Sequence, residues 1–269
     1  MARGRTARML THRLLADGSR TRAPDELIVE EPLEVRLDGV RVATTMRTPG
    51  DDFELAVGLC HGDGLLGGAP VVRCRYCATG SAVDSEFNVV TVETGGKAPA
   101  AEPRIGVMSS SCGMCGTTAL DDLAGRLDPL PPAAPLDFQI VIGVAHEMAE
   151  RQPLFQATGA VHAAASFDGA GEIGHVREDI GRHNAVDKVV GRLLLDGALP
   201  ASGQGLFVSG RASFELVQKA WAAGFGTLVA VSAPSALAVQ AARRGGLTLV
   251  GFARGGAANV YSPADLDRR

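Results

Sequence analysis

Two Cys-x-x-Cys pairs are the residues of this sequence whose types and spacing indicate chemistry: Cys74 with Cys77, and Cys112 with Cys115. The second pair lies in a run of small residues, Ser-Ser-Ser-Cys-Gly-Met-Cys-Gly, which favours an open loop. A neighbouring thiol and an adjacent helix N-terminus both lower the pKa of a thiol. A thiolate in this setting can attack the terminal sulfur of a donor persulfide, hold it as Cys-S-SH and pass it on.

The cysteines also fit other chemistries. One pair alone is compatible with a structural role or thioredoxin-like exchange, and two pairs together could form a closed four-thiolate zinc site. The 34 residues between the pairs exceed the ~15–20 of common zinc motifs, which weakens the zinc interpretation without removing it. Cys60 is expected to be a small buried hydrophobe. Five cysteines, an odd number with two Cys-x-x-Cys pairs, fit a reducing compartment, so we expect a cytoplasmic protein.

Length and composition limit the other possibilities. A chain of 269 residues is long enough for one large domain, or for a large and a small one. Hydrophobic residues make up 46% and charged residues 21%, which is globular composition, and no apolar run approaches the ~20 residues of a membrane span. The net charge of -4 gives no reason to expect nucleic-acid binding. Residues 1–22 carry six arginines but lack the apolar stretch of a secretory signal, and we interpret them as a mobile basic arm.

The first half of the chain predicts short strands and one short helix. Loose alternation from 26 to 42 around Asp38-Gly39 predicts a hairpin, and residues 71–92 predict further strands. Between them, Asp51 or Asp52 could cap a helix that stops at Gly62. Pro- and Ala-rich spacers at 98–103 and 130–136 flank the second cysteine pair, with a helix expected to begin near Thr117.

The second half predicts an α/β fold. A hairpin is expected over 160–176, turning at 168–169, and apolar spacing predicts a helix around 186–194 that Gly197 ends. A βαβαβ unit then follows, with strands at 206–209, 227–231 and 247–252 and helices at 212–223 and 235–244. Parallel strands with right-handed crossovers bring the loops after each strand to one edge of the sheet.

Those convergent loops suit an anionic nucleotide. They contain Ser209 with Arg211, then Ser232, then residues 252–256 with Arg254. Loops at strand carboxyl ends and helix N-termini offer unpaired amides and a positive partial charge, which phosphate groups favour. The plain alternative is that short loops of this kind simply favour Gly and Ser.

Two histidines require separate interpretation. His162 resembles part of a zinc-deaminase pattern, but the Glu that this chemistry needs two residues later is absent. His183 stands beside Arg182 and Asn184, where it could bind an anion or pair with Glu178 and Asp179. A capping and salt-bridge network explains the same residues equally well.

A resemblance to a known family rests on motifs in a fixed order over residues 27–262. These motifs are residues 48–52 (Thr-Pro-Gly-Asp-Asp), 109–116, 158–164 (Thr-Gly-Ala-Val-His-Ala-Ala), 178–188 (Glu-Asp-Ile-Gly-Arg-His-Asn-Ala-Val-Asp-Lys), 209–211 and 249–254. In this respect the chain resembles the formate dehydrogenase accessory sulfurtransferases, the FdhD family. The pair Cys74 and Cys77 lies outside these motifs.

The resemblance implies a function. It implies transfer of persulfide sulfur from a cysteine desulfurase to the molybdenum cofactor of formate dehydrogenase, Mo-bis(molybdopterin guanine dinucleotide), which would be a bound substrate with no permanent cofactor. Cys112 would carry the persulfide and Cys115 would be a relay or resolving thiol. The cofactor-binding segment would be Gly251, Phe252, Ala253, Arg254, Gly255 and Gly256, supplemented by Ser209, Arg211 and Ser232, and no metal ligand is expected.

The resemblance also implies a fold and an assembly. The larger domain would have a cytidine-deaminase-like α/β sheet, the smaller an α+β structure, and the protein would be a homodimer. We expect the arm at 1–22, the smaller domain at 23–105, the Cys-x-x-Cys segment with its helix and connection at 106–136, and the larger domain at 137–269. Two alternative functions stay open: a cofactor-binding chaperone without covalent transfer, and a zinc-stabilised structural or regulatory protein.

Overall fold

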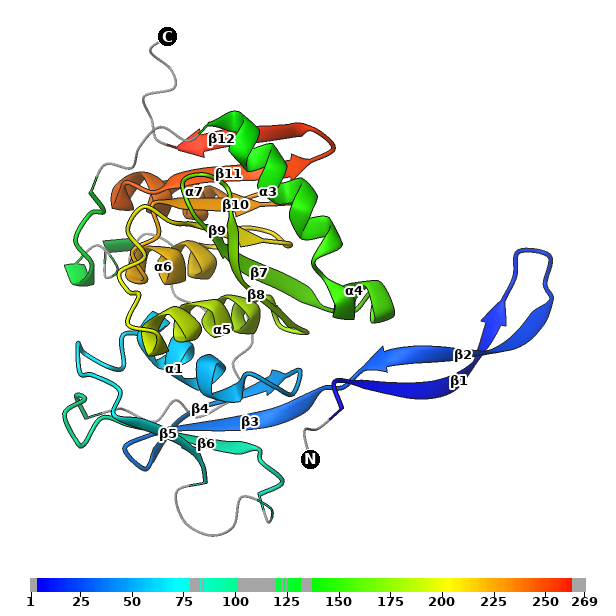
Figure 1. Cartoon of the computed structure of the whole chain (residues 1–269), viewed down its shortest axis with the longest axis horizontal. Helices are drawn as coiled ribbons and strands as arrows, with labels where there is room; N and C mark the ends of the chain where they lie inside the picture. Colours follow the sequence, from blue (N-terminus) through cyan, green and yellow to red (C-terminus); the bar gives the residue numbers. More distant parts are fainter. Residues whose placement is uncertain are drawn as a thin grey trace.

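The protein consists of two stacked α/β parts and a projecting hairpin, as a computed structural model shows (Figure 1). The structure describes residues 4–77, 83, 85–100, 120, 121, 123, 125–131 and 137–262. One part is a four-stranded sheet with strand order β4-β3-β6-β5, and the other is a six-stranded sheet with order β12-β11-β10-β9-β7-β8. The prediction of an α/β fold with a second, smaller sheet is therefore confirmed.

The elements of the N-terminal half are β1 (Thr6–Leu14), β2 (Arg20–Ile28), β3 (Glu31–Leu37), β4 (Val40–Arg47), α1 (Asp52–Gly62), β5 (Arg73–Tyr76) and β6 (Val89–Glu93). The predicted turn at Asp38-Gly39 joins β3 to β4, and both residues have the positive φ that such a tight turn requires. Residues 1–22 were interpreted as a mobile basic arm, but residues 6–22 form most of the paired hairpin β1–β2, which continues to Ile28. The proposed domain boundaries remain predictions.

Helix α1 packs unusually close to α5 (Arg182–Leu195) because both carry glycine at the crossing. A Cβ atom on Gly58 would lie 1.8 Å from the carbonyl oxygen of Asp187, and one on Gly191 would lie 1.8 Å from that of Glu54. Asp51 occupies the N-cap position of α1, as predicted, but its side chain makes no capping hydrogen bond. Its carboxylate accepts a hydrogen bond from Arg5 instead, so that part of the prediction is wrong.

The elements of the C-terminal half are α3 (Phe138–Glu150), α4 (Pro153–Thr158), β7 (His162–Phe167), β8 (Ile173–Asp179), α5, β9 (Gly205–Val208), α6 (Phe214–Ala222), β10 (Thr227–Ala230), α7 (Ala236–Gly245), β11 (Thr248–Arg254) and β12 (Ala257–Ser262). Strands β9, β10 and β11 are parallel, which confirms the predicted βαβαβ unit. Helices α5, α6 and α7 pack on one face of the sheet and α3 on the other.

One boundary differs from the prediction in the segment expected to bind the cofactor. Residues 252–256 were expected to form a loop, but β11 extends to Arg254 and pairs antiparallel with β12. Gly255 and Gly256, with φ of 59° and 76°, form the turn of that hairpin. No helix within the described ranges is long and apolar enough to cross a bilayer.

Candidate functional site at the sheet edge

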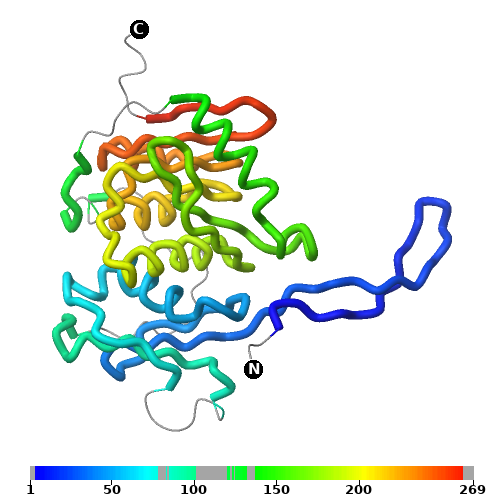
Figure 2. Tube along the Cα trace, viewed as in Figure 1, coloured from blue at the N-terminus to red at the C-terminus, as the bar shows by residue number. Residues whose placement is uncertain are grey.

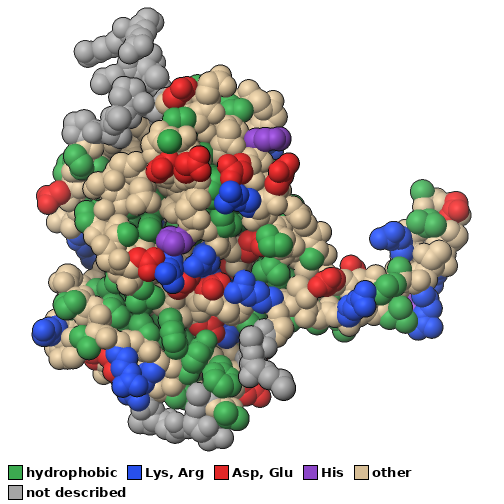
Figure 3. Space-filling view, viewed as in Figure 1, with side chains coloured by type: hydrophobic (Ala, Val, Ile, Leu, Met, Phe, Trp, Pro, Cys, Tyr) green, Lys and Arg blue, Asp and Glu red, His purple; other side chains and the backbone are tan. Residues whose placement is uncertain are grey.

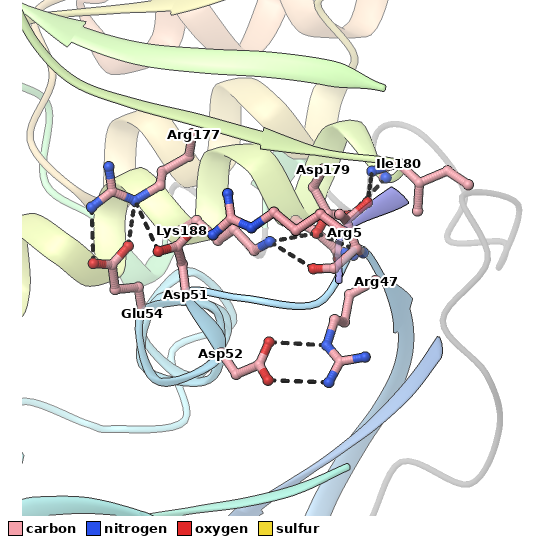
Figure 4. Close-up of polar contacts among 12 residues, drawn as sticks. Arg5, Arg47, Asp51, Asp52, Glu54, Arg177, Asp179, Ile180 and Lys188 are labelled. Atoms are coloured by element: carbon pink, nitrogen blue, oxygen red, sulfur yellow. Dashed lines mark hydrogen bonds and ion pairs between the residues drawn. The ribbon is translucent and has the colours of Figure 1, made fainter. Parts of the chain in front are cut away.

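The motifs at 48–52 and 178–188 meet between the two sheets, where most of their charged residues bond to one another (Figure 4). Lys188 is fully buried and pairs with Asp179 at 2.8 Å. It also donates a hydrogen bond to the carbonyl oxygen of Thr48 at 3.0 Å, while the Thr48 amide donates to Asp179 Oδ2 at 3.1 Å. These bonds satisfy buried charges, which indicates a structural role for this part of the motifs.

Further ion pairs extend this junction along α1. Arg47 has no exposed side-chain surface and makes two bonds to Asp52, at 2.9 and 3.1 Å. Arg177 makes a similar two-bond contact with Glu54, at 2.5 and 2.9 Å. Bidentate arginine–carboxylate geometry fixes relative orientation as well as distance. Arg47 and Asp52 hold β4 to α1, and the pair of Arg177 on β8 with Glu54 on α1 fixes how the small-sheet half sits on the large sheet.

The interpretation of the 178–184 stretch as a capping and salt-bridge network is confirmed for most of its members. The carboxylate of Glu178 accepts hydrogen bonds from the amides of Leu154 and Phe155 at the start of α4. The Asn184 side chain donates to Asp179 and to the Met46 carbonyl oxygen. The suggested pairing of the polar group around His183 with Asp179 therefore holds for Asn184, whereas the Nε2 of His183 lies 3.1 Å from Glu215 Oε2.

A group of basic side chains remains at the edge where the parallel strands end. We call this group the cationic cluster; its members are His162, Arg182, His183 and Arg211. Burial lowers the pKa of His162, and the positive charges of Arg182, His183 and Arg211 lower it further. Gly210 lies against the imidazole, since a Cβ there would be 3.3 Å from Nδ1.

Arg182 offers a buried donor that the described residues leave unpaired. Its Nε is buried and has no hydrogen-bond partner within the described part of the chain. Buried donors are almost always satisfied in folded proteins, by protein, water or ligand. Arg182 begins α5, so its side chain and the free amides of the helix N-terminus contribute positive charge at the same place. The cluster therefore suits an anionic group.

The three predicted loops converge at this edge, as expected. The Ser232 amide donates to the carbonyl oxygen of Gly210 at 3.3 Å, and the Phe252 amide donates to that of Ser232 at 3.2 Å. Ser209 is committed to the sheet, because its hydroxyl accepts a hydrogen bond from the Ala163 amide at 2.9 Å. One backbone-linked surface thus runs from the cationic cluster to β11.

Residues 251–256 differ in what they can offer a ligand. A Cβ on Gly251 would lie 2.9 Å from Pro234 Cδ, so only glycine fits that close approach. Phe252 has a left-handed φ of 54°, and the Arg254 guanidinium lies 5.8 Å from the centre of its ring. Ala253 is 1% exposed and its side chain belongs to the core, so it can contribute only backbone atoms. Arg254 and the two glycines of the turn are exposed.

The cysteines divide into two groups. Cys112 and Cys115 lie outside the described residues. Cys60 is fully buried, as predicted, and burial raises its pKa far above the usual range. Burial likewise raises the pKa of Cys74 to about 11. The ranges that the structure describes contain no group of three His, Cys, Asp or Glu side chains placed to hold a metal, so a zinc site that includes the second pair stays a prediction.

The chain that follows the second cysteine pair is attached at the far edge of the large sheet. The Trp221 indole donates to the carbonyl oxygen of Asp128 at 2.8 Å, and the Leu130 amide donates to that of Gly245 at 2.8 Å. Trp221 and Gly245 lie near the C-terminal ends of α6 and α7, at the edge opposite the cationic cluster. The attachment of residues 128–130 and the candidate anion site therefore lie at opposite ends of the parallel strands.

Comparison with known proteins establishes the family. A model of the FdhD/NarQ family matches residues 28–266. The chain belongs to the FdhD/NarQ family. Two relatives named sulfur carrier protein FdhD are similar to it over nearly their whole length: that of Streptomyces avermitilis is 48% identical, covering 92% of this chain and 91% of the relative, and that of Nocardia farcinica is 47% identical, covering 96% and 94%.

A solved structure supports the FdhD/NarQ fold. The crystal structure of a proposed formate dehydrogenase accessory protein from Desulfotalea psychrophila superposes with a TM-score of 0.76. It covers 97% of this chain and 99% of the other, at 23% sequence identity. At that level of identity the likeness concerns the fold.

In this FdhD/NarQ chain, the sequence left open whether Arg182 binds an anion or belongs to a salt-bridge network, and it assigned His162 no role once deaminase chemistry was rejected. The signal that could have separated Arg182 from its structural neighbours was position, since it starts a helix next to a parallel sheet edge. Asp179, Asn184 and Lys188 belong to the same motif but bond to the small-sheet half of the chain. The structural role and the anion-binding role can be distinguished only by the residues that each side chain contacts in the folded protein.

Proposed function

We propose that this protein is a sulfurtransferase that carries persulfide sulfur from a cysteine desulfurase to Mo-bis(molybdopterin guanine dinucleotide), the substrate that it sulfurates for formate dehydrogenase. The observation that carries the proposal is the match, over more than 90% of the chain, to relatives named sulfur carriers. The Cys112 thiolate attacks the terminal sulfur of the donor persulfide, the donor S–S bond breaks, and the donor cysteine leaves as a thiolate. Cys115 serves as the relay or resolving thiol.

The cationic cluster and the adjoining loops are proposed to hold the phosphates of the guanine dinucleotide. A pyrophosphate offers many acceptor oxygens, and the buried Nε of Arg182 supplies an unsatisfied donor. Arg211, after β9, and Arg254, at the end of β11, add positive charge along the same edge, with backbone amides near the N-termini of α6 and α7. The cationic cluster and its adjoining loops thus combine fixed positive charge with backbone amides that a phosphate group can approach closely.

The first test measures covalent addition of sulfur to the protein. Incubation of the full-length protein with a cysteine desulfurase and cysteine is expected to add about 32 Da, one sulfur atom, at Cys112. Peptide mass spectrometry under non-reducing conditions locates the adduct. Protein that remains unmodified while still binding the cofactor would overturn the sulfurtransferase proposal and favour the non-covalent chaperone.

The second prediction concerns the anion site. Arg182→Gln and Arg211→Gln are each expected to weaken binding of guanosine diphosphate by roughly 10- to 100-fold, the usual loss for a charge-assisted hydrogen bond. Arg244→Gln, an exposed arginine at the far end of α7, is the matched control and should bind like the parent. Isothermal titration calorimetry measures all three, and equal affinities across the set would show that the site lies elsewhere.

The same site should respond to pH. Burial and nearby cations hold the pKa of His162 below its usual value, so the free protein carries this imidazole neutral at pH 7. A bound phosphate favours the protonated form and raises that pKa. Affinity for guanosine diphosphate is therefore expected to increase as the pH falls from 8 to 6, and to decrease with added salt.

A further inference from the structure

Glu215 is an acidic side chain beside an otherwise basic site. In the described part of the chain, no other carboxylate hydrogen-bonds to a member of the cationic cluster: Glu215 Oε2 lies 3.1 Å from Nε2 of His183. The Ser213 hydroxyl donates to the same oxygen at 3.2 Å. Both of these bonds go to Oε2, so Oε1 is available to a ligand while the carboxylate is held in place.

The position of Glu215 places it next to the proposed phosphate site. Helices α5 and α6 lie side by side on one face of the large sheet, as the trace in Figure 2 shows, and share one hydrophobic core. Arg182 begins α5, and Glu215 lies in the first turn of α6. Hydrogen bonding to His183 lowers the pKa of Glu215, and the charge of Arg182 lowers it further, so the carboxylate is ionised at neutral pH.

Exposed carboxylates elsewhere on the protein need no ligand to explain them. Figure 3 shows several gathered over the large-sheet half of the molecule, where they face water. Glu215 differs, because its negative charge repels the phosphate groups that the neighbouring cationic cluster attracts. A group of this kind disfavours a ligand that brings only phosphates to the site, and favours one that also brings hydrogen-bond donors.

A guanine base offers suitable donors. Its Watson–Crick edge carries the N1–H group and the N2 amino group next to each other, which matches the acceptor oxygens of a carboxylate. Adenine has an acceptor nitrogen at N1, which a carboxylate repels. A carboxylate has about four acceptor positions on its two oxygens, so Oε2 can accept a further bond beside those it already makes. An ionised carboxylate at this place therefore selects guanine over adenine.

We propose that Glu215 recognises the guanine base of the bound nucleotide, accepting hydrogen bonds from N1–H and the N2 amino group while the cationic cluster holds the phosphates. This inference rests on the proposed function, which brings a guanine nucleotide to this edge of the sheet. Ser213 and His183 orient the carboxylate through their bonds to Oε2. Glu215 thus determines which nucleotide binds and takes no part in the transfer of sulfur.

Binding of three nucleoside diphosphates to the full-length protein tests the proposal. The parent is expected to bind guanosine diphosphate about tenfold more tightly than inosine diphosphate, which lacks the N2 amino group, and at least about 100-fold more tightly than adenosine diphosphate. Glu215→Ala removes both acceptor oxygens, so this variant should bind guanosine and inosine diphosphates equally. Isothermal titration calorimetry measures the ratios, and an unchanged thermal unfolding temperature checks that the half-buried site still folds.

The matched control is Arg211→Gln, which removes charge from the phosphate site and leaves the carboxylate in place. It should weaken all three nucleotides by the same factor and keep the preference for guanine. A parent that binds guanosine and inosine diphosphates equally would overturn the inference and leave the cofactor site intact. So would equal weakening of all three by Glu215→Ala, since Glu215 would then act only by orienting His183. A parent that binds none of the three would overturn the proposed cofactor site and this inference with it.

Discussion

Formate dehydrogenase matured in cells that contain only the Cys112→Ala variant is expected to be inactive, with activity at least about a hundredfold below the level supported by the parent protein. The physical reason is that the alanine methyl group has no sulfur atom, so it can neither attack a persulfide nor hold one. Binding of guanosine diphosphate should be unchanged, since its proposed site is built from His162, Arg182 and Arg211 at the sheet edge. The measurement is formate oxidation by the purified dehydrogenase.

The matched control for this variant is Cys74→Ala. Cys74 is half-buried on β5 and its pKa is raised to about 11 by burial, so it is mostly a protonated thiol at neutral pH. We expect it to support full dehydrogenase activity and to leave the persulfide adduct at Cys112 in place. Normal dehydrogenase activity with Cys112→Ala would contradict the carrier mechanism, and loss of activity with both variants accompanied by loss of zinc would favour a structural metal site.

Much of the large sheet was predictable because its elements are specified locally. The spacing of Val186, Val189 and Leu193 predicts one buried stripe, and all three lie in the core of the six-stranded sheet. The alternation of short apolar strands with helices after residue 205 leaves parallel pairing as the natural arrangement. In each case the pattern that forms the element also determines which face is buried.

The parts that could not be predicted depend on contacts between distant residues. Asp51 has the sequence context of a helix cap, but Arg5 lies close enough to take its carboxylate. The end of β11 could not be located because a bulge at Phe252 lets the strand continue past a Gly-rich stretch and pair with β12. Arg182 could not be separated from its neighbours until their partners were known.

A second large effect, on the free energy of unfolding, is expected from the buried Lys219 in the core. Replacing Lys219 with Met should lower the free energy of unfolding by about 3–5 kcal/mol, the usual cost of removing one partner from a buried ion pair. Lys219 is 4% exposed, and its Nζ lies 2.7 Å from Asp187 Oδ1 on α5 and 3.7 Å from Asp63 Oδ1 at the end of α1. Met preserves most of the apolar stem but leaves Asp187 as a buried charge without its closest cation.

The stability lost in Lys219→Met should depend on pH. Burial raises the pKa of Asp187 to about 6 even beside Lys219, and removal of the ammonium raises it further. Because this folded-state pKa lies above the ordinary 3.8, the unfolded chain releases its proton first as pH rises, and stability falls through the window from about 4 to beyond 6. Urea unfolding should therefore show Lys219→Met closer to the parent at pH 5 than at pH 8.

The double variant Lys219→Met with Asp187→Asn tests whether the uncompensated charge is the cause. Asn keeps the size of Asp187 and removes its charge, so the double variant should recover most of the loss, and the double-mutant cycle should show strong coupling. Arg151→Met, which breaks an exposed pair with Glu147 on α3, should cost no more than about 0.5 kcal/mol. If the double variant were no more stable than Lys219→Met alone, lost packing rather than a buried charge would explain the effect.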